Sequence, residues 1–144
     1  MAVSDNQVAT LRAQLRGDYA EYERLFAGLD QSDNDGYTSL IAAAFVLAAE
    51  RRFRPGGTRP DIILYVANVR SQTRKAAEGI DPKIGERLLL AALTGEPIDD
   101  IDADTAVVTE LLLLVAMTAG DDFPEADIEN LLVEARDTVD RVTS

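Results

Sequence analysis

The sequence predicts an all-α protein that folds as a compact bundle of about six helices. Apolar residues recur at intervals of three and four along nearly the whole chain, which is the period of an amphipathic helix. No segment keeps the alternation of apolar and polar residues that marks a strand. Glycines, prolines and acidic turns divide the chain into six segments. The length of 144 residues suits a single domain, because it allows roughly 70% of the unfolded surface to be buried.

The first three predicted helices are bounded by capping, turn and breaker residues. Ser4 and Gln7 form a capping-box pattern at the start of the first helix. The acidic turn 30–36 follows that helix, a Pro-Gly-Gly stop ends the second, and Pro60 suits the first turn of the third. These helices are predicted at residues 4–28, 37–54 and 60–79.

The last three predicted helices differ in how much of their surface is apolar. Asp81 and Pro82 open the fourth helix as cap and first-turn residue, and Gly95 ends it. The fifth is apolar on almost every side, which is typical of the buried centre of a bundle. The sixth carries one apolar stripe that runs from Ile128 to Val142. These helices are predicted at residues 81–95, 105–119 and 124–142.

A weak internal repeat suggests a duplication. The tripeptide Glu-Arg-Leu at 23–25 recurs at 86–88, and the apolar pattern of 61–70 recurs at 127–136. Leucine- and alanine-rich helices also match each other by chance, which is the alternative explanation. We therefore keep as a hypothesis that the chain contains two duplicated three-helix halves. The predicted halves are residues 1–80 and 81–144.

The residue inventory excludes most familiar catalytic chemistry. The chain has no His, Cys or Trp, so Ser-His-Asp and Cys-His catalysis, thiol redox chemistry and histidine-bearing zinc sites are excluded. It shows no secretory signal, and its longest apolar run, 40–49, is about half of a membrane span. We expect no catalytic residue and a cytoplasmic protein that does not bind a membrane.

Two acidic loops raise the question of a calcium site. Asp100, Asp102 and Asp104 have the spacing that opens an EF-hand loop. Thr105, however, stands where the sharp turn needs glycine, and Leu111 stands where the closing glutamate belongs. The loop at 31–42 lacks the closing ligand too. Carboxylates in such turns more often cap helices, so we expect no metal and no cofactor.

Glu110 is an acidic residue in the otherwise apolar fifth helix. If it is buried, it needs an arginine partner or a raised pKa. We favour a structural ion pair over a catalytic acid.

Charge is distributed unevenly along the chain. The net charge is −12, which argues against binding to nucleic acid. From Glu96 onward the chain has fourteen acidic and two basic residues, whereas residues 51–75 are strongly basic. The basic residues either neutralise the acidic helices internally, which we favour, or face an acidic partner. As candidate partner-binding residues we take Arg51, Arg52, Arg54, Arg59, Arg70, Arg74 and Lys75.

Three functions remain open on this basis. The leading hypothesis is a small protein-interaction module, such as a regulator or inhibitor, that binds a protein partner or a second copy. The aromatic residues Tyr19, Tyr22 and Phe26 are expected in the core, with a dimer seam as the alternative. The second hypothesis is a helical pocket protein that binds a small apolar ligand, with Arg or Tyr at the mouth. The third is an acidic mimic of nucleic acid that uses the carboxylates Glu125, Glu129, Asp137 and Asp140.

Overall fold

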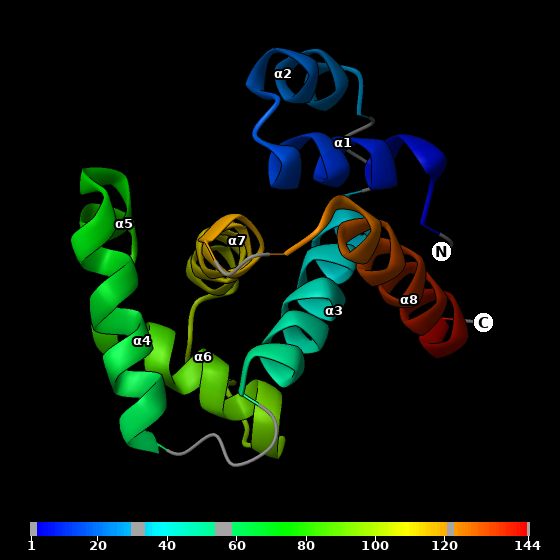
Figure 1. Ribbon diagram of the computed structural model, residues 1–144. Helices are drawn as coiled ribbons and strands as arrows, with labels where there is room; N and C mark the ends of the chain where they lie inside the picture. The colour runs from blue at the N-terminus through cyan, green and yellow to red at the C-terminus, as the bar shows by residue number, and fades with distance from the viewer. Residues whose placement is uncertain (1–2, 30–33, 54–58, 121–122, 144) are drawn as a thin grey trace.

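A computed structural model describes residues 3–29, 34–53, 59–120 and 123–143. All of the regular secondary structure in these residues is helical (Figure 1). It confirms the predicted all-α class. None of the helices described is both long and apolar enough to cross a membrane. The helices are α1 (Asp5–Arg16), α2 (Tyr19–Ala27), α3 (Asn34–Phe53), α4 (Arg59–Gln72), α5 (Arg74–Gly79), α6 (Pro82–Thr94), α7 (Ala103–Gly120) and α8 (Glu125–Thr143).

The predicted count of six helices is wrong, because two of the predicted helices are each split in two. Gly17 has a left-handed backbone (φ 75°) that ends α1. The side chain of Asp18 then accepts a hydrogen bond from the backbone N–H of Glu21 and starts α2. The other split lies at Thr73, whose side chain accepts from the N–H of Ala76 and starts α5.

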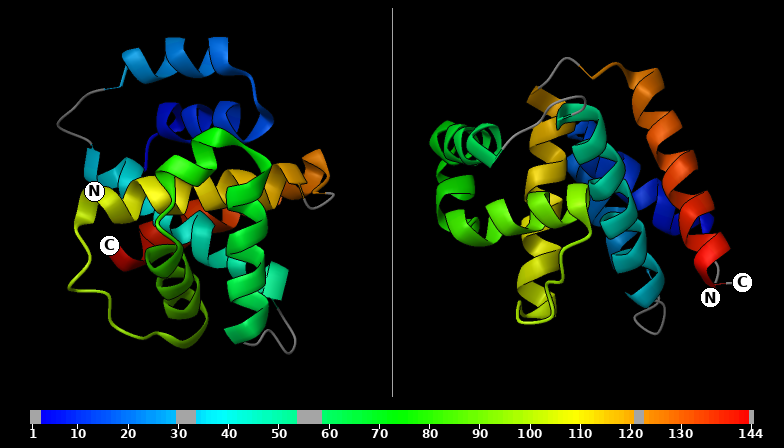
Figure 2. Two further views of the ribbon diagram at one scale, coloured as in Figure 1. Left: turned by 90° about the vertical axis from the view of Figure 1, so that its left-hand side faces the viewer. Right: turned by 90° about the horizontal axis from the view of Figure 1, so that it is seen from below.

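Helices α3 and α7 form the centre of the molecule (Figure 2). α3 packs against α1, α6, α7 and α8, and α7 packs against α1, α3, α5 and α6. The two helices bury the same pattern of positions, shifted by 69 residues in the sequence. On α3 the buried positions in this pattern are 37, 40, 41, 44, 45, 48 and 49; on α7 they are 106, 109, 110, 113, 114, 117 and 118.

The outer helices α4 and α8 also match each other, with a shift of 66 residues. Positions 62, 65, 66 and 69 are buried on α4, and positions 128, 131, 132 and 135 are buried on α8. α4 packs on α5 and α6, whereas α8 packs on α3 and α1. α4, in the first predicted half, therefore lies on α6, the first helix of the second half. α8, in the second half, lies on α1, the first helix of the first half.

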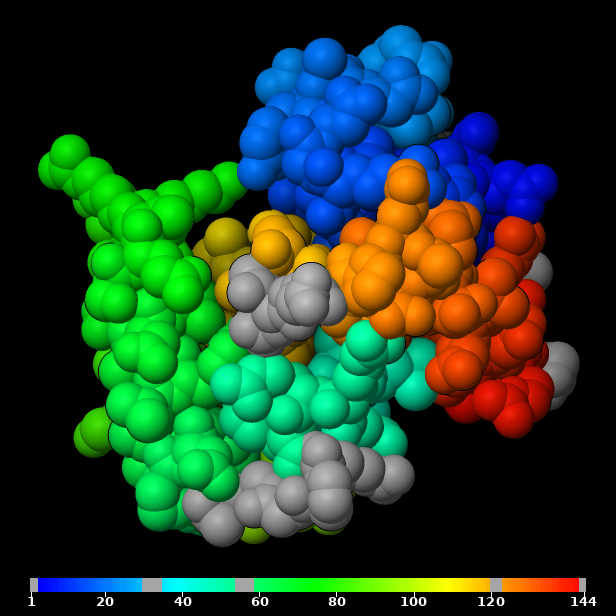
Figure 3. Space-filling model, in the orientation of Figure 1, coloured from blue at the N-terminus to red at the C-terminus, as the bar shows by residue number. Residues whose placement is uncertain are grey.

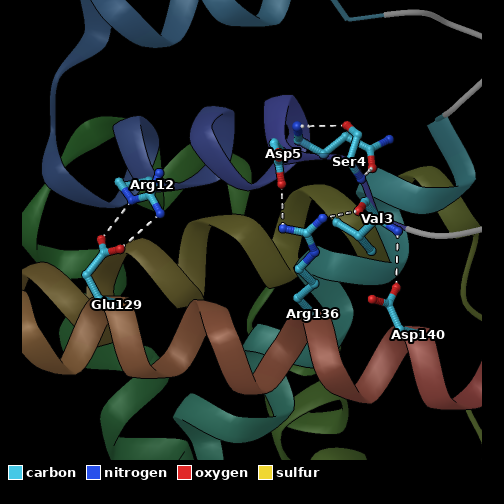
Figure 4. A network of polar contacts seen from close by, with 8 residues as sticks. Val3, Ser4, Asp5, Arg12, Glu129, Arg136 and Asp140 are labelled. Carbon is cyan, nitrogen blue, oxygen red and sulfur yellow. Dashed lines mark hydrogen bonds and ion pairs between the residues drawn. The ribbon is translucent and has the colours of Figure 1, made fainter.

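An arginine on each outer helix donates to the residue that precedes a helix start. Nη2 of Arg136 on α8 donates to the carbonyl oxygen of Val3 at 2.9 Å, just before α1 (Figure 4). Nε of Arg70 on α4 donates to the carbonyl oxygen of Ile80 at 2.7 Å, just before the cap of α6. Val3 and Ile80 are both buried. These bonds tie α8 to α1 and α4 to α6.

Ion pairs strengthen the contact between α8 and α1. Arg12 donates to both carboxylate oxygens of Glu129, at 2.7 and 2.9 Å (Figure 4). The hydrogen bond from Arg12 lowers the pKa of Glu129. Arg16 also lies 2.9 Å from Glu125. The acidic face of α8 is thus partly neutralised within the fold.

Candidate functional site

Six of the seven predicted basic residues lie in the part of the chain that the structure describes, and these six do not form one patch. They lie at the C-terminal end of α3 and along α4 and α5, and they fall into two sets. Arg54 lies outside the described residues. One set, the inner arginines, contacts other elements of the fold and consists of Arg51, Arg52 and Arg70. The other set, the outer cations, is exposed and consists of Arg59, Arg74 and Lys75.

Two of the inner arginines hold the C-terminal end of α3 to neighbouring elements. Arg51 pairs with Asp127 of α8 at 2.7 Å and lies over the ring of Phe123. Arg52 lies over the ring of Tyr65 on α4, 4.8 Å from its centroid. A cation over an aromatic ring gains about 0.5–1 kcal/mol when exposed. Both guanidinium groups therefore stabilise packing around α3.

The third inner arginine, Arg70, joins α4 to the chain that leads into α6. Besides its bond to Ile80, it donates to the carbonyl oxygen of Ala77 at 3.1 Å. A hydrogen bond from a charged group contributes about 1.5–3 kcal/mol. Arg70 therefore acts within the fold, but its partners are carbonyl groups and it does not neutralise an acidic helix as we expected. Among the inner arginines, Arg51 forms an ion pair of the expected kind, with Asp127 of α8.

The outer cations lie on the side of α4 and α5 that faces away from the molecule. Arg74 pairs with Glu78, one turn further along α5, at 3.1 Å, and its side chain is 90% exposed. Such a surface pair contributes little to stability. Arg59 and Lys75 are exposed at the start of α4 and on α5. Within the described residues, these three charges make no contact with another helix of the core.

Two aliphatic side chains lie between the outer cations. Ile63 and Leu64 on α4 are 44% and 62% exposed. Ile63 follows Arg59 by four residues and precedes exposed Ala67 by four, so the three share one side of the helix. We call this surface the α4–α5 face; it consists of Arg59, Ile63, Leu64, Ala67, Arg74 and Lys75. Figure 3 shows α4 and α5 forming one edge of the molecule.

The acidic loop before α7 uses its carboxylates within the fold. Asp100 accepts from both terminal nitrogens of Arg87, at 2.8 Å each. The hydrogen bonds from Arg87 lower the pKa of Asp100. Asp102 accepts from the N–H of Thr105 and caps α7. Across the described ranges, no group of three or more potential ligands is placed to hold a metal ion.

Glu110 is buried, with 8% of its surface exposed. Burial raises the pKa of this carboxyl to about 7. Among the residues the structure describes, no cation forms the ion pair that we expected. Glu110 occupies the position on α7 that matches buried Ile41 on α3.

The aromatic residues of α2 do not lie in the core, contrary to our expectation. α2 has no buried residue, and Tyr19 and Phe26 are 58% and 51% exposed. Phe26 contacts the rings of Tyr22 and Tyr37. The α2 helix therefore covers part of α1 and α3 without adding to the buried core.

The hollows that the structure describes are open to solvent and lined by both polar and apolar groups. One, of about 520 Å³, lies over Leu47 and is lined by Glu134, Asp137 and Asp140 of α8. Another, of about 470 Å³, lies between α1 and α8 and is lined by Leu15, Arg16, Tyr19 and Ile128 among others. A smaller one, about 140 Å³, lies between Ala48, Met117 and Phe123, with Arg51 and Arg52 at its edge. Small-molecule sites commonly measure about 300–1,000 Å³. The hollow of about 140 Å³ is thus below this range, whereas the two larger ones lie within it but are open to solvent.

Comparison of the chain with models of protein families, with curated proteins and with solved structures finds no match. The case for a function therefore rests on the geometry of the molecule.

Proposed function

We propose that this protein is a protein-interaction module and that the α4–α5 face is its binding surface. The observation that carries the proposal is the exposure of Ile63 and Leu64 between cations that have no packing role. An aliphatic centre with a charged rim is the usual composition of a protein interface. The positive rim favours a partner segment with carboxylates at its edges, since arginine binds carboxylates through two parallel hydrogen bonds.

The basic residues of the α4–α5 face supply the charge that such a partner needs. Residues 59–79 carry four basic and two acidic side chains, a net charge of +2 in a chain of net charge −12. Arg70 uses its charge internally. The outward charges are those of Arg59, Arg74 and Lys75 against Asp61 and Glu78, a net charge of +1. Local complementarity of this kind accelerates association more than it tightens binding.

A photo-crosslinking residue at position 64 tests the proposal in cells that express the chain. Position 19 on α2 is the matched control, because Tyr19 and Leu64 are exposed to nearly the same extent, 58% and 62%. We expect a discrete cross-linked protein from position 64 and none from position 19. Equal labelling from both positions, or no product from position 64, contradicts the proposal.

The two alternative functions have less support. The pocket hypothesis would use a hollow of about 470 Å³, in which Arg16 and Tyr19 lie beside Leu15 and Ile128, but that hollow is open to solvent rather than enclosed. The mimic hypothesis depends on carboxylates of α8, but Glu125 and Glu129 pair with arginines of α1. Asp140 also accepts from the N–H of Val3. Few of these charges are left for a DNA-binding partner.

We also propose that the fold is a duplication of two interlocked halves. The matched buried patterns of α3 with α7 and of α4 with α8 support this proposal, as do the two arginine–carbonyl bonds. The first helices match as well: Ser4 and Asp81 cap the starts of α1 and α6, and left-handed Gly17 and Gly95 end them. In this arrangement α6 corresponds to α1. The repeated tripeptide Glu-Arg-Leu had instead matched α6 (86–88) with α2 (23–25).

A further inference from the structure

The outer side of α8 has a composition opposite to that of the α4–α5 face. Residues 125–143 carry six acidic and two basic side chains. Glu125, Asp127 and Glu129 pair with arginines of α1 and α3, so the outward negative charge is that of Glu134 and Asp137. Val133 is 59% exposed in the middle of this helix, and Glu134 and Asp137 are exposed beside it. We call this surface the α8 face; it consists of Asn130, Val133, Glu134 and Asp137. It too has an aliphatic centre with a charged rim, but the rim is negative.

The two faces occupy matching places on the molecule. Val133 on α8 lies 66 residues after Ala67 on α4, the same shift that relates their buried positions. α4 and α5 lie on one side of the molecule and α8 on the opposite side, with α3 and α7 between them (Figures 1 and 2). The faces therefore cannot meet within one chain, but they can meet between two chains.

From this geometry we infer that the partner of the α4–α5 face is the α8 face of a second copy of this chain. The inference rests on the proposed binding role of the α4–α5 face. The charges of the two faces are opposite, and each has an exposed aliphatic residue at its centre. A contact between two different faces is heterologous, so each bound copy leaves one face free and the assembly grows head to tail.

The net charge of −12 sets the conditions for this contact. Two copies repel each other at long range in dilute salt. At 0.15 M salt the screening length is about 8 Å, so repulsion between distant charges weakens while ion pairs at the contact persist. The association is therefore expected to be strongest near physiological salt and weaker at much lower or much higher salt.

Sedimentation velocity of two variants, alone and mixed, tests the inference. One variant disables the α4–α5 face (Arg59→Glu, Leu64→Asp and Lys75→Glu), and the other disables the α8 face (Glu134→Lys and Asp137→Lys). The wild-type chain should form species larger than a dimer as its concentration rises. Each variant alone should stay monomeric, and their equimolar mixture should form a dimer and nothing larger. That result is specific to a heterologous contact, because each variant retains one intact face.

Two outcomes overturn the inference. The wild-type chain could remain monomeric up to about 1 mM, the dissociation constant of a very weak contact. Alternatively, both variants could assemble as the wild type does. If either occurs while position 64 still cross-links a different protein, the second copy is the wrong partner and the binding role of the α4–α5 face stands. If position 64 labels nothing, the binding role fails too.

Discussion

Helices α4 and α8 pack into the fold with the same pattern of buried positions, but their exposed sides differ in charge and composition. Four buried positions of α4 recur on α8 with the same spacing, and each helix donates from an arginine to the carbonyl that precedes another helix. Outward, however, α4 presents aliphatic residues, with Arg59 at its start and Arg74 and Lys75 on the following α5, whereas α8 presents carboxylates around one valine. The inward match is what packing requires. The exposed sides are not constrained by packing, so the difference between them points to a difference in what each side binds.

The largest expected effect tests the inward match. Ile62 on α4 and Ile128 on α8 occupy equivalent positions and are both buried. Replacing either by alanine removes buried methyl and methylene groups and leaves a cavity, so each substitution should cost about 2–5 kcal/mol of the free energy of unfolding. Denaturant unfolding of the two variants measures this cost. If the free energy of unfolding falls by less than about 1 kcal/mol at one position and by more at the other, the two helices do not contribute equally to the core.

The next effect extends the comparison to the central helices α3 and α7, where Ile41 is matched by Glu110. The pKa of Glu110 is about 7 in the folded protein, against 4.5 for an ordinary glutamate. Below pH about 4.5 the carboxyl of Glu110 is protonated in both the folded and the unfolded chain, so its ionisation does not lower the stability. Between pH about 4.5 and 7 the unfolded chain ionises first, so stability falls, and above pH 7 the loss levels off near 3 kcal/mol.

Replacing Glu110 by glutamine should therefore raise the stability at pH 8 and flatten its decline between pH 5 and 7. Unfolding curves across this pH range measure the effect, and Glu134→Gln on the exposed side of α8 is the control. If the two variants show the same pH dependence, Glu110 is not the group responsible.

Much of the fold could be predicted from local sequence. The bounds of α6 and α8 are close to those predicted, because their caps and stripes are unambiguous. The break at Gly17 was missed because apolar spacing continues across it from Leu15 to Tyr22. The pair Gly17-Asp18 combines a residue that ends helices with one that caps them, and this pair is the sign of the break in the sequence. Thr73 has no glycine or proline beside it, so the sequence holds only a weak sign of that break.

The candidate site was harder to predict, because neighbours in a helical sequence point in different directions. Arg51 and Arg52 are adjacent in the chain, yet one reaches α8 and the other α4. The exposure of Ile63 and Leu64 depends on which side of α4 is buried, and Ile62 and Tyr65 on either side of them are both buried. An apolar run of this kind does not reveal its outer face until its packing partners are known.

A matched pair of triple variants tests whether the basic residues divide into an inner set with packing contacts and an outer set without them. One reverses the inner arginines (Arg51, Arg52 and Arg70) to Glu, and the other reverses the outer cations (Arg59, Arg74 and Lys75) to Glu. Both make the same change in net charge, so any difference between them reports contacts rather than overall charge.

Thermal melts at low and high salt provide the measurement. Reversing the inner set should remove at least about 2 kcal/mol, a fall in Tm of about 4–8 °C for a domain of this size. Reversing the outer set should lower Tm by no more than about 3 °C, since exposed charges contribute little. Equal falls in Tm for both variants, or a larger fall for the outer set, would show that the inner arginines contribute no more to packing than the outer cations.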